Sequence, residues 1–266
     1  MKIPPDIRKC VVFIGLQKAN GEYVFAGTGL LISYRFSDKS TSYILTAKHV
    51  IDGIKSKGVE FVHIRVNLTT GESKWYKSGV QDWILHEDDN VHIALLSSGM
   101  ETTWNHLFLA INDYILTPQI ITENEIDVGE EVFLVGLFKH HHGNKLNVPI
   151  VRIGNISALN EEKIQTKYHL MDAYLIECRS IGGLSGSPVF INLGEQRVIK
   201  KPMVHNRIGQ KFYLFGIIHG HYDSNISAID NIQTDEQSKE NDRVNTGIAI
   251  VTPVEKIIEL LKTLNP

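Results

Sequence analysis

The sequence predicts an all-β fold of two packed, six-stranded antiparallel β-barrels with a C-terminal α-helix. Short apolar runs rich in Val, Ile, Phe and Tyr recur along the chain, with polar turns between them. These runs fall into two sets of about six, which is the number that a pair of antiparallel barrels needs. Only the end of the chain places apolar residues at helical spacing.

The strands expected in the first half are all rich in β-branched and aromatic residues. They cover 11–16, 23–33, 42–51, 61–68, 79–85 and 92–97. Those expected in the second half cover 131–138, 149–158, 173–178, 187–192, 211–219 and 246–251. The segment 104–118 is expected to carry the crossover. We therefore expect a first barrel over residues 1–112 and a second over 113–266.

The last segment predicts a helix over 252–261, with Thr252 as its cap and Pro253 in its first turn. The polar stretch 230–242 has no apolar pattern, and we expect a surface loop there between the last two strands.

Composition narrows the functional classes. The chain has 266 residues, 42% of them hydrophobic and 21% charged, which suits a globular protein with a large core. Its net charge of −3 argues against a nucleic-acid partner, and its apolar runs are too short to span a membrane. A secretory leader is not recognisable, so we expect a cytoplasmic protein. The two cysteines, Cys10 and Cys178, lie in apolar runs and predict buried thiols rather than a disulfide framework.

The most informative segment is the octet Gly183-Leu184-Ser185-Gly186-Ser187-Pro188-Val189-Phe190. Its glycines allow positive φ and a sharp bend, which would present the Ser185 hydroxyl as a nucleophile. The same bend would direct the N–H groups of Gly183 and Ser185 at one point. Two converging amides are what a developing oxyanion requires.

A base for this serine is available upstream. The run from Tyr43 predicts a buried strand that breaks at Ala47 into a short turn carrying His49. A neutral imidazole at the end of a rigid strand can be held in one tautomer and accept a serine proton. The segment Gly27-Thr28-Gly29 begins a further strand, which we expect to pair with it antiparallel.

Together these segments resemble the chymotrypsin-like, or trypsin-like, serine peptidases. The resemblance rests on Gly27-Thr28-Gly29, Thr46-Ala47-Lys48-His49-Val50, the Ser185 octet and a late strand over 214–220. It runs from about residue 10 to the C-terminus, with the histidine before the serine as in that family. It implies a serine endopeptidase that cleaves a protein or peptide through an acyl-enzyme, without a metal or organic cofactor.

The third member of the triad departs from the family. Relatives carry Asp just before an apolar-Ala-apolar strand, whereas this chain has His92 before Ile93 and Ala94. A period of two puts His92 and Ala94 on one face, so His92 is expected to point toward His49. Three alternatives stay open: His92 orients His49, Asp88 or Asp89 does so, or the site no longer turns over substrate.

The resemblance also implies a substrate pocket. Its edge would be formed by His219 and Gly220, and its floor by Arg179, which would favour an acidic residue before the scissile bond. The likeness of the late strand to bacterial glutamyl endopeptidases points the same way. The alternative for Arg179 is an outward side chain that pairs with Glu177.

Two further alternatives concern ligands. The triplet His140-His141-His142 is followed by Gly143 and Asn144, which favours a hairpin tip over a metal site. A chain with this cleft but without turnover would be a peptide-binding module, which is the second function that the sequence allows. The oligomeric state has no signal in the sequence.

Overall fold

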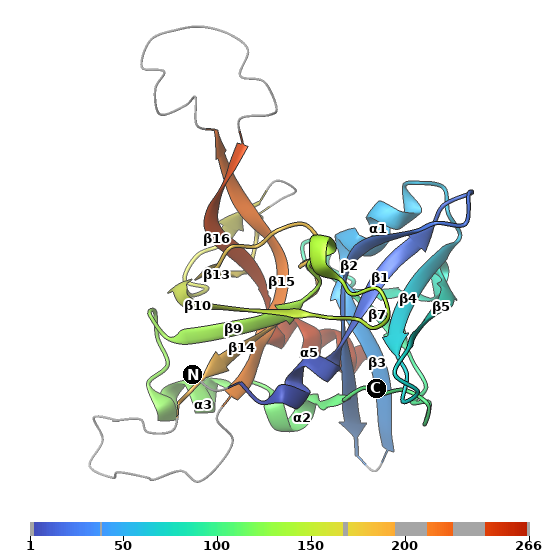
Figure 1. Cartoon of the computed structure of the whole chain (residues 1–266). Coiled ribbons are helices and arrows are strands. Elements are labelled where there is room, and N and C mark those ends of the chain that lie inside the picture. Colours follow the sequence, from blue (N-terminus) through green and yellow to red (C-terminus); the bar gives the residue numbers. More distant parts are fainter. Residues whose placement is uncertain (1–2, 38, 167–169, 195–211, 226–242, 265–266) are drawn as a thin grey trace, which may run out of the picture.

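Two β-structures lie side by side in the computed structural model, the first built by the N-terminal part of the chain and the second by the C-terminal part (Figure 1). The structure describes residues 3–37, 39–166, 170–194, 212–225 and 243–264. The stretch 230–242, for which we expected a loop, lies outside these residues.

The first structure is an eight-stranded sheet with the order β5-β4-β1-β2-β3-β7-β6, to which β8 adds by pairing with β2. Its strands are β1 (Val11–Gln17), β2 (Tyr23–Phe36), β3 (Lys39–Ala47), β4 (Phe61–Asn67), β5 (Ser73–Gly79), β6 (Ile84–Leu85), β7 (Ile93–Ser97) and β8 (Leu109–Ala110). A 3-10 turn, η1 (Pro5–Cys10), precedes β1, and helix α1 (Lys48–Lys55) follows β3.

This sheet differs from the six-stranded barrel that the sequence predicts. It has eight strands, and the pairing among the described residues does not join β5 to β6, so a closed first barrel stays a prediction. The run 79–85 is not one strand. A 3-10 turn, η2 (Val80–Asp82), interrupts it because the Asp82 carboxylate accepts a 2.7 Å hydrogen bond from the Gly79 N–H.

The second structure is a closed barrel with the order β10-β13-β16-β15-β14-β9, which confirms one six-stranded barrel. Its strands are β9 (Glu131–Gly136), β10 (Ile150–Ala158), β13 (Tyr174–Glu177), β14 (Pro188–Asn192), β15 (Phe212–Asn225) and β16 (Arg243–Pro253). A turn η3 (Lys139–His141) follows β9, and the short strands β11 (Ile164–Gln165) and β12 (Leu170–Met171) pair with each other.

Two short helices, α2 (Ile111–Tyr114) and α3 (Pro118–Asn124), connect the two structures. The C-terminal helix is confirmed as α5 (Val254–Thr263), but it begins two residues after the predicted start. Thr252 does not cap it, because this residue still pairs with Ile217 in the barrel.

One hydrophobic core runs through both structures. It joins Leu30 and Leu45 of the first sheet to Phe133 and Phe190 of the barrel and to Ile257 of α5. A second core fills the other face of the first sheet and packs it against α1. Since both units share the larger core, the division at residue 112 stays a prediction.

Arg65 in β4 fastens the β9–β10 loop to the first sheet. Its guanidinium donates to the carbonyl oxygens of Gly143 at 2.7 Å and Asn144 at 2.6 Å, and Asn147 Nδ2 donates back to Arg65 O at 2.6 Å. Charge-assisted bonds of this kind are about twice as strong as neutral ones. The loop that leaves the barrel is therefore held on the first sheet at a polar contact.

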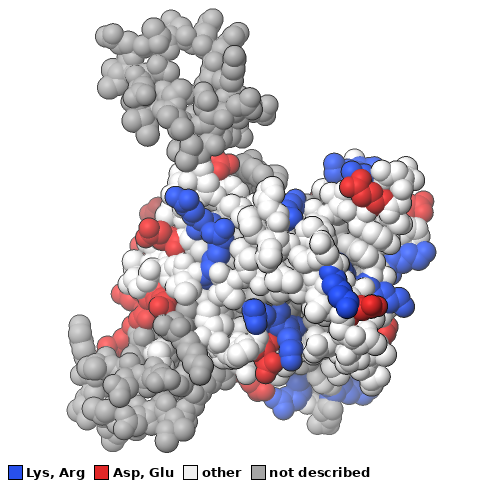
Figure 2. Space-filling view, viewed as in Figure 1, with Lys and Arg blue, Asp and Glu red and all other residues white. Residues whose placement is uncertain are grey.

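Lysine and arginine side chains are interspersed with acidic ones on the face shown in Figure 2, without one large field of either sign. This distribution agrees with the small net charge of −3. Over the part of the chain that is described, helices are too short or too polar to cross a membrane.

Candidate active site

His49 lies in the first turn of α1, directly after the buried end of β3 at Ala47. The sequence predicts only a short turn here. Eight residues form a helix instead, because Val50, Ile51 and Ile54 share one face and are buried. Packing of that face holds the helix, and with it the partly buried His49, against the first sheet.

His92 lies one residue before β7, and its side chain is 7% exposed. The pairing of Ala47 with Ile93 carries it to the start of α1, where its carbonyl oxygen accepts a 3.2 Å hydrogen bond from the Lys48 N–H. The ring centroids of His49 and His92 are 6.2 Å apart.

A third histidine joins this pair. His219 in β15 is 3% exposed, and its ring centroid lies 5.2 Å from that of His49 and 4.8 Å from that of His92. It sits where the pairing of β15 with β16 shifts register between Ile218 and Gly220. Such a bulge re-aims a side chain, which explains why simple alternation along the strand did not predict this contact.

The loop that carries Ser185 bends as the glycines predict. Gly183 and Gly186 have φ of +106° and +84°, in the region that favours glycine. Leu184 is fully buried between them and Ser185 is partly buried. A Cβ at Gly186 would collide with the Thr28 carbonyl oxygen and with Thr46 Oγ1, so only glycine fits there.

Thr28 binds this loop on both sides of Ser185. Its N–H donates to Ser185 O at 2.9 Å, and its hydroxyl donates to Gly183 O at 2.9 Å. The same hydroxyl accepts from Leu137 N–H at 2.9 Å and from Ser187 Oγ at 3.2 Å. One donor and two lone pairs are all that a hydroxyl offers, and all three are used.

Gly27 shows how near the two halves of the site come. A Cβ added to it would lie 2.8 Å from Val50 Cγ2 and 3.0 Å from Ser185 O. The chain at Gly27 therefore passes between the helix of His49 and the Ser185 main chain, with no room for a side chain.

The loop also leaves two amides available. The N–H groups of Leu184, Gly186 and Ser187 donate to carbonyl oxygens at 2.8–3.1 Å. Within the described residues, the N–H groups of Gly183 and Ser185 have no acceptor. These are the two amides that the sequence predicts for an oxyanion.

Asp88 and Asp89 are both engaged at the surface. The Asp89 side chain is 93% exposed and pairs with Lys48 Nζ at 2.7 Å, which lowers the pKa of the carboxyl. Asp88 accepts from the Asn90 N–H at 2.8 Å, which lowers its pKa in the same way.

The residues expected around the substrate differ in burial. Arg179 is exposed, while His219 is buried against the two other histidines, and the pocket predicted from them stays a prediction. A Cβ at Gly220 would meet no atom within 4 Å. Next to it, His221 pairs with Asp223 at 3.2 Å.

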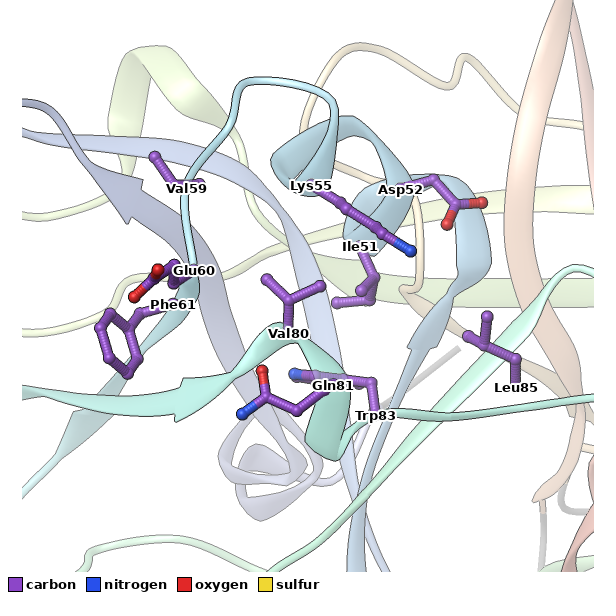
Figure 3. A pocket seen from close by; sticks show the side chains of 10 residues that line it. All are labelled: Ile51, Asp52, Lys55, Val59, Glu60, Phe61, Val80, Gln81, Trp83 and Leu85. Carbon is purple, nitrogen blue, oxygen red and sulfur yellow. The ribbon is translucent and has the colours of Figure 1, made fainter.

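A cavity of about 560 Å³ lies beside α1 (Figure 3). Ile51, Asp52 and Lys55 of α1 face it from one side, and Val80 and Trp83 from the other (Figure 3). No residue predicted for the site lines it, so the cavity takes no part in the candidate chemistry.

Both cysteines are free and buried, as predicted. Burial raises the pKa of the Cys10 and Cys178 thiols, which keeps both in the unreactive protonated form.

Comparison with known proteins identifies the fold and the family. The structure is similar to the crystal structure of the MamO protease domain from Magnetospirillum magneticum, with a TM-score of 0.54 at 14% identity over 96% of this chain and 97% of that one. An inactive serine-to-alanine mutant of Rv3671c from M. tuberculosis H37Rv matches with a TM-score of 0.49 at 14% identity, over 97% and 89% of the chains. No curated protein sequence matches. The family model described as trypsin-like peptidase domain matches residues 27–199, well over half of the chain. The protein therefore belongs to the trypsin-like peptidase family.

Proposed function

We propose that the protein is a serine endopeptidase in which Ser185 attacks the substrate and His49 moves its proton. The observation that carries this proposal is the set of bonds from Thr28, which holds the loop on both sides of Ser185. Thr46, three residues before His49, donates in turn to the Thr28 carbonyl oxygen at 2.7 Å. The nucleophile loop and the segment leading to the base thus share one buried polar contact.

In the proposed reaction, His49 accepts the hydroxyl proton as the Ser185 oxygen bonds to the carbonyl carbon of the scissile peptide. The resulting oxyanion accepts from the N–H groups of Gly183 and Ser185. His49 then gives its proton to the leaving amine, and the C–N bond breaks to leave an acyl-enzyme. Water, deprotonated by His49, then attacks the acyl-enzyme. As the ester bond breaks, His49 returns the proton to the Ser185 oxygen.

His92 is the proposed orienting residue, which gives a Ser-His-His arrangement. Its buried ring beside His49 supports this role, and the engagement of both nearby aspartates at the surface favours it over a Ser-His-Asp triad. A neutral imidazole can accept a hydrogen bond from a second histidine. It supplies no negative charge for the imidazolium that forms, so we expect slower turnover than with a carboxylate.

The substrate is proposed to be an extended protein or peptide. A preference for an acidic residue before the cut rests on Arg179 alone, since His219 is buried among the histidines. The comparison of Arg179→Ala with Arg179→Glu on peptides that differ only in Glu or Gln before the scissile bond tests it. A preference for Glu that both variants retain excludes Arg179 as its source.

A fluorophosphonate probe tests the nucleophile directly. We expect one adduct per chain, located on Ser185 by mass spectrometry, and no adduct in Ser185→Ala. Removal of the base in His49→Ala should slow labelling by about 10²–10⁴-fold, the usual contribution of a general base. Absence of labelling between about pH 6 and pH 9, where a histidine base becomes neutral, would overturn the proposal. Peptide binding without labelling would then favour a non-catalytic module.

A further inference from the structure

The three histidines of the site form a set that the peptidase reaction does not require. One ring nitrogen from each of His49, His92 and His219 lies within 4.8 Å of the other two. A triad needs two such side chains at most, a base and its orienting partner. The third ring, from the bulge in β15, converges on the same point.

We propose that these three histidines bind a Zn²⁺ ion, which switches off the peptidase by occupying the ring nitrogen of its base. The inhibition by zinc rests on the proposed peptidase function, whereas the metal site itself does not. Zn²⁺ commonly takes three histidine ligands and keeps a fourth position for water.

The spacing of the rings supports the proposal. Zn–N bonds of about 2.0–2.1 Å at tetrahedral angles place ligand nitrogens about 3.3 Å apart and ring centroids about 5 Å apart. The observed centroid distances of 4.8, 5.2 and 6.2 Å lie around that value. A small rotation of His49, the least buried of the three, would bring its nitrogen into the ligand sphere.

Burial and exposure divide the roles within the site. His92 and His219 are 7% and 3% exposed, which limits their motion and favours a preformed pair of ligands. His49 is more exposed, so a dissolved ion can reach this ligand. When it binds zinc, its nitrogen no longer accepts a proton from Ser185, so acylation stops.

The first experiment measures binding without turnover. Co²⁺, a spectroscopic substitute for the silent Zn²⁺ ion, is titrated into the full chain carrying Ser185→Ala. We expect one Co²⁺ per chain with the intense visible bands of four-coordinate cobalt, displaced by Zn²⁺. Adding His219→Ala should weaken binding by more than the roughly 10–100-fold that loss of an outer-shell partner costs.

The matched control uses the exposed histidines of the β9–β10 loop. His140→Ala/His141→Ala removes two imidazoles at the surface and should leave the bands and the affinity unchanged. If this double variant abolishes binding while His219→Ala retains it, or if no four-coordinate cobalt forms, the proposed site is wrong.

The second experiment separates this inference from the peptidase proposal. Zn²⁺ should slow fluorophosphonate labelling of Ser185, and a chelator should restore the labelling rate. In His219→Ala, a higher zinc concentration should be needed to slow labelling by the same fraction of that variant's zinc-free rate. Cobalt binding without any labelling would retain the metal site and reject the peptidase. Labelling that zinc does not slow would reject the switch.

Discussion

Replacement of Thr28 by valine should loosen the nucleophile loop while keeping the shape of the side chain. The hydroxyl makes three buried hydrogen bonds, to Gly183 O and from Leu137 N–H and Ser187 Oγ. Each is worth about 1 kcal/mol net, and a buried partner left without a bond costs about 1–3 kcal/mol. We therefore expect a loss of roughly 3–5 kcal/mol in the free energy of unfolding.

For a chain of this size, each kcal/mol lowers the melting temperature by roughly 2–4 °C. Thermal and denaturant unfolding followed by circular dichroism should show Thr28→Val melting roughly 6–20 °C below the wild type. Thr28→Ser, which keeps the hydroxyl and loses one methyl group, is the matched control and should retain most of the stability. Under conditions where Thr28→Val is still folded, its labelling by the fluorophosphonate should be slower than that of Thr28→Ser. Equal melting temperatures and equal labelling rates in the two variants would refute the role given to this hydroxyl.

Three further predictions concern other residues. Gly186→Ala should abolish fluorophosphonate labelling, because its Cβ has no space and φ is +84°; wild-type labelling of a folded variant would contradict this. His92→Ala should slow labelling more than His92→Asp, which restores a carboxylate, and the reverse order would exclude His92 as the orienting residue. Burial lowers the pKa of His106, and the opposing bond from its ring to Lys9 O only partly offsets this. Neutral His106 also accepts a 2.8 Å hydrogen bond from the Asn67 N–H. Because the unfolded chain binds the proton more readily, the contribution of neutral His106 to the free energy of unfolding is complete above about pH 6.5 and declines below it. In His106→Gln, denaturant midpoints should fall less between pH 7 and pH 5 (roughly the histidine range), and identical slopes would reject this assignment.

The sequence predicted those elements that depend on local pattern. Continuous β-branched and aromatic runs gave β1 and β14 nearly to the residue, and helical spacing gave α5. One error arose where a side chain bonds locally: the Asp82 carboxylate accepts from the Gly79 N–H, and a 3-10 turn replaces the middle of the predicted strand 79–85. Such turns depend on geometry that hydrophobic periodicity does not encode.

The site was predictable to the extent that motifs define it. Glycines around Ser185 and the segment before His49 were enough to expect a nucleophile and a base. The role of Thr28 was not, because two of its hydroxyl partners lie 155 and 159 positions away in the chain. The burial of His219 depends on a register shift in β15, and a shift of one residue changes the face on which a side chain lies.

The hydrogen bonds from Arg65 to the β9–β10 loop affect which residues of this loop can vary among relatives. Its guanidinium bonds to the main-chain oxygens of Gly143 and Asn144, which every amino acid possesses. A substitution at Asn144 therefore leaves its bond to Arg65 intact. Gly143 and Asn147 are constrained, because Gly143 has φ of +82° with no space for a Cβ and the Asn147 side chain donates to Arg65 O. Relatives with this anchor are thus expected to vary the loop at Asn144 and to keep Gly143 and Asn147.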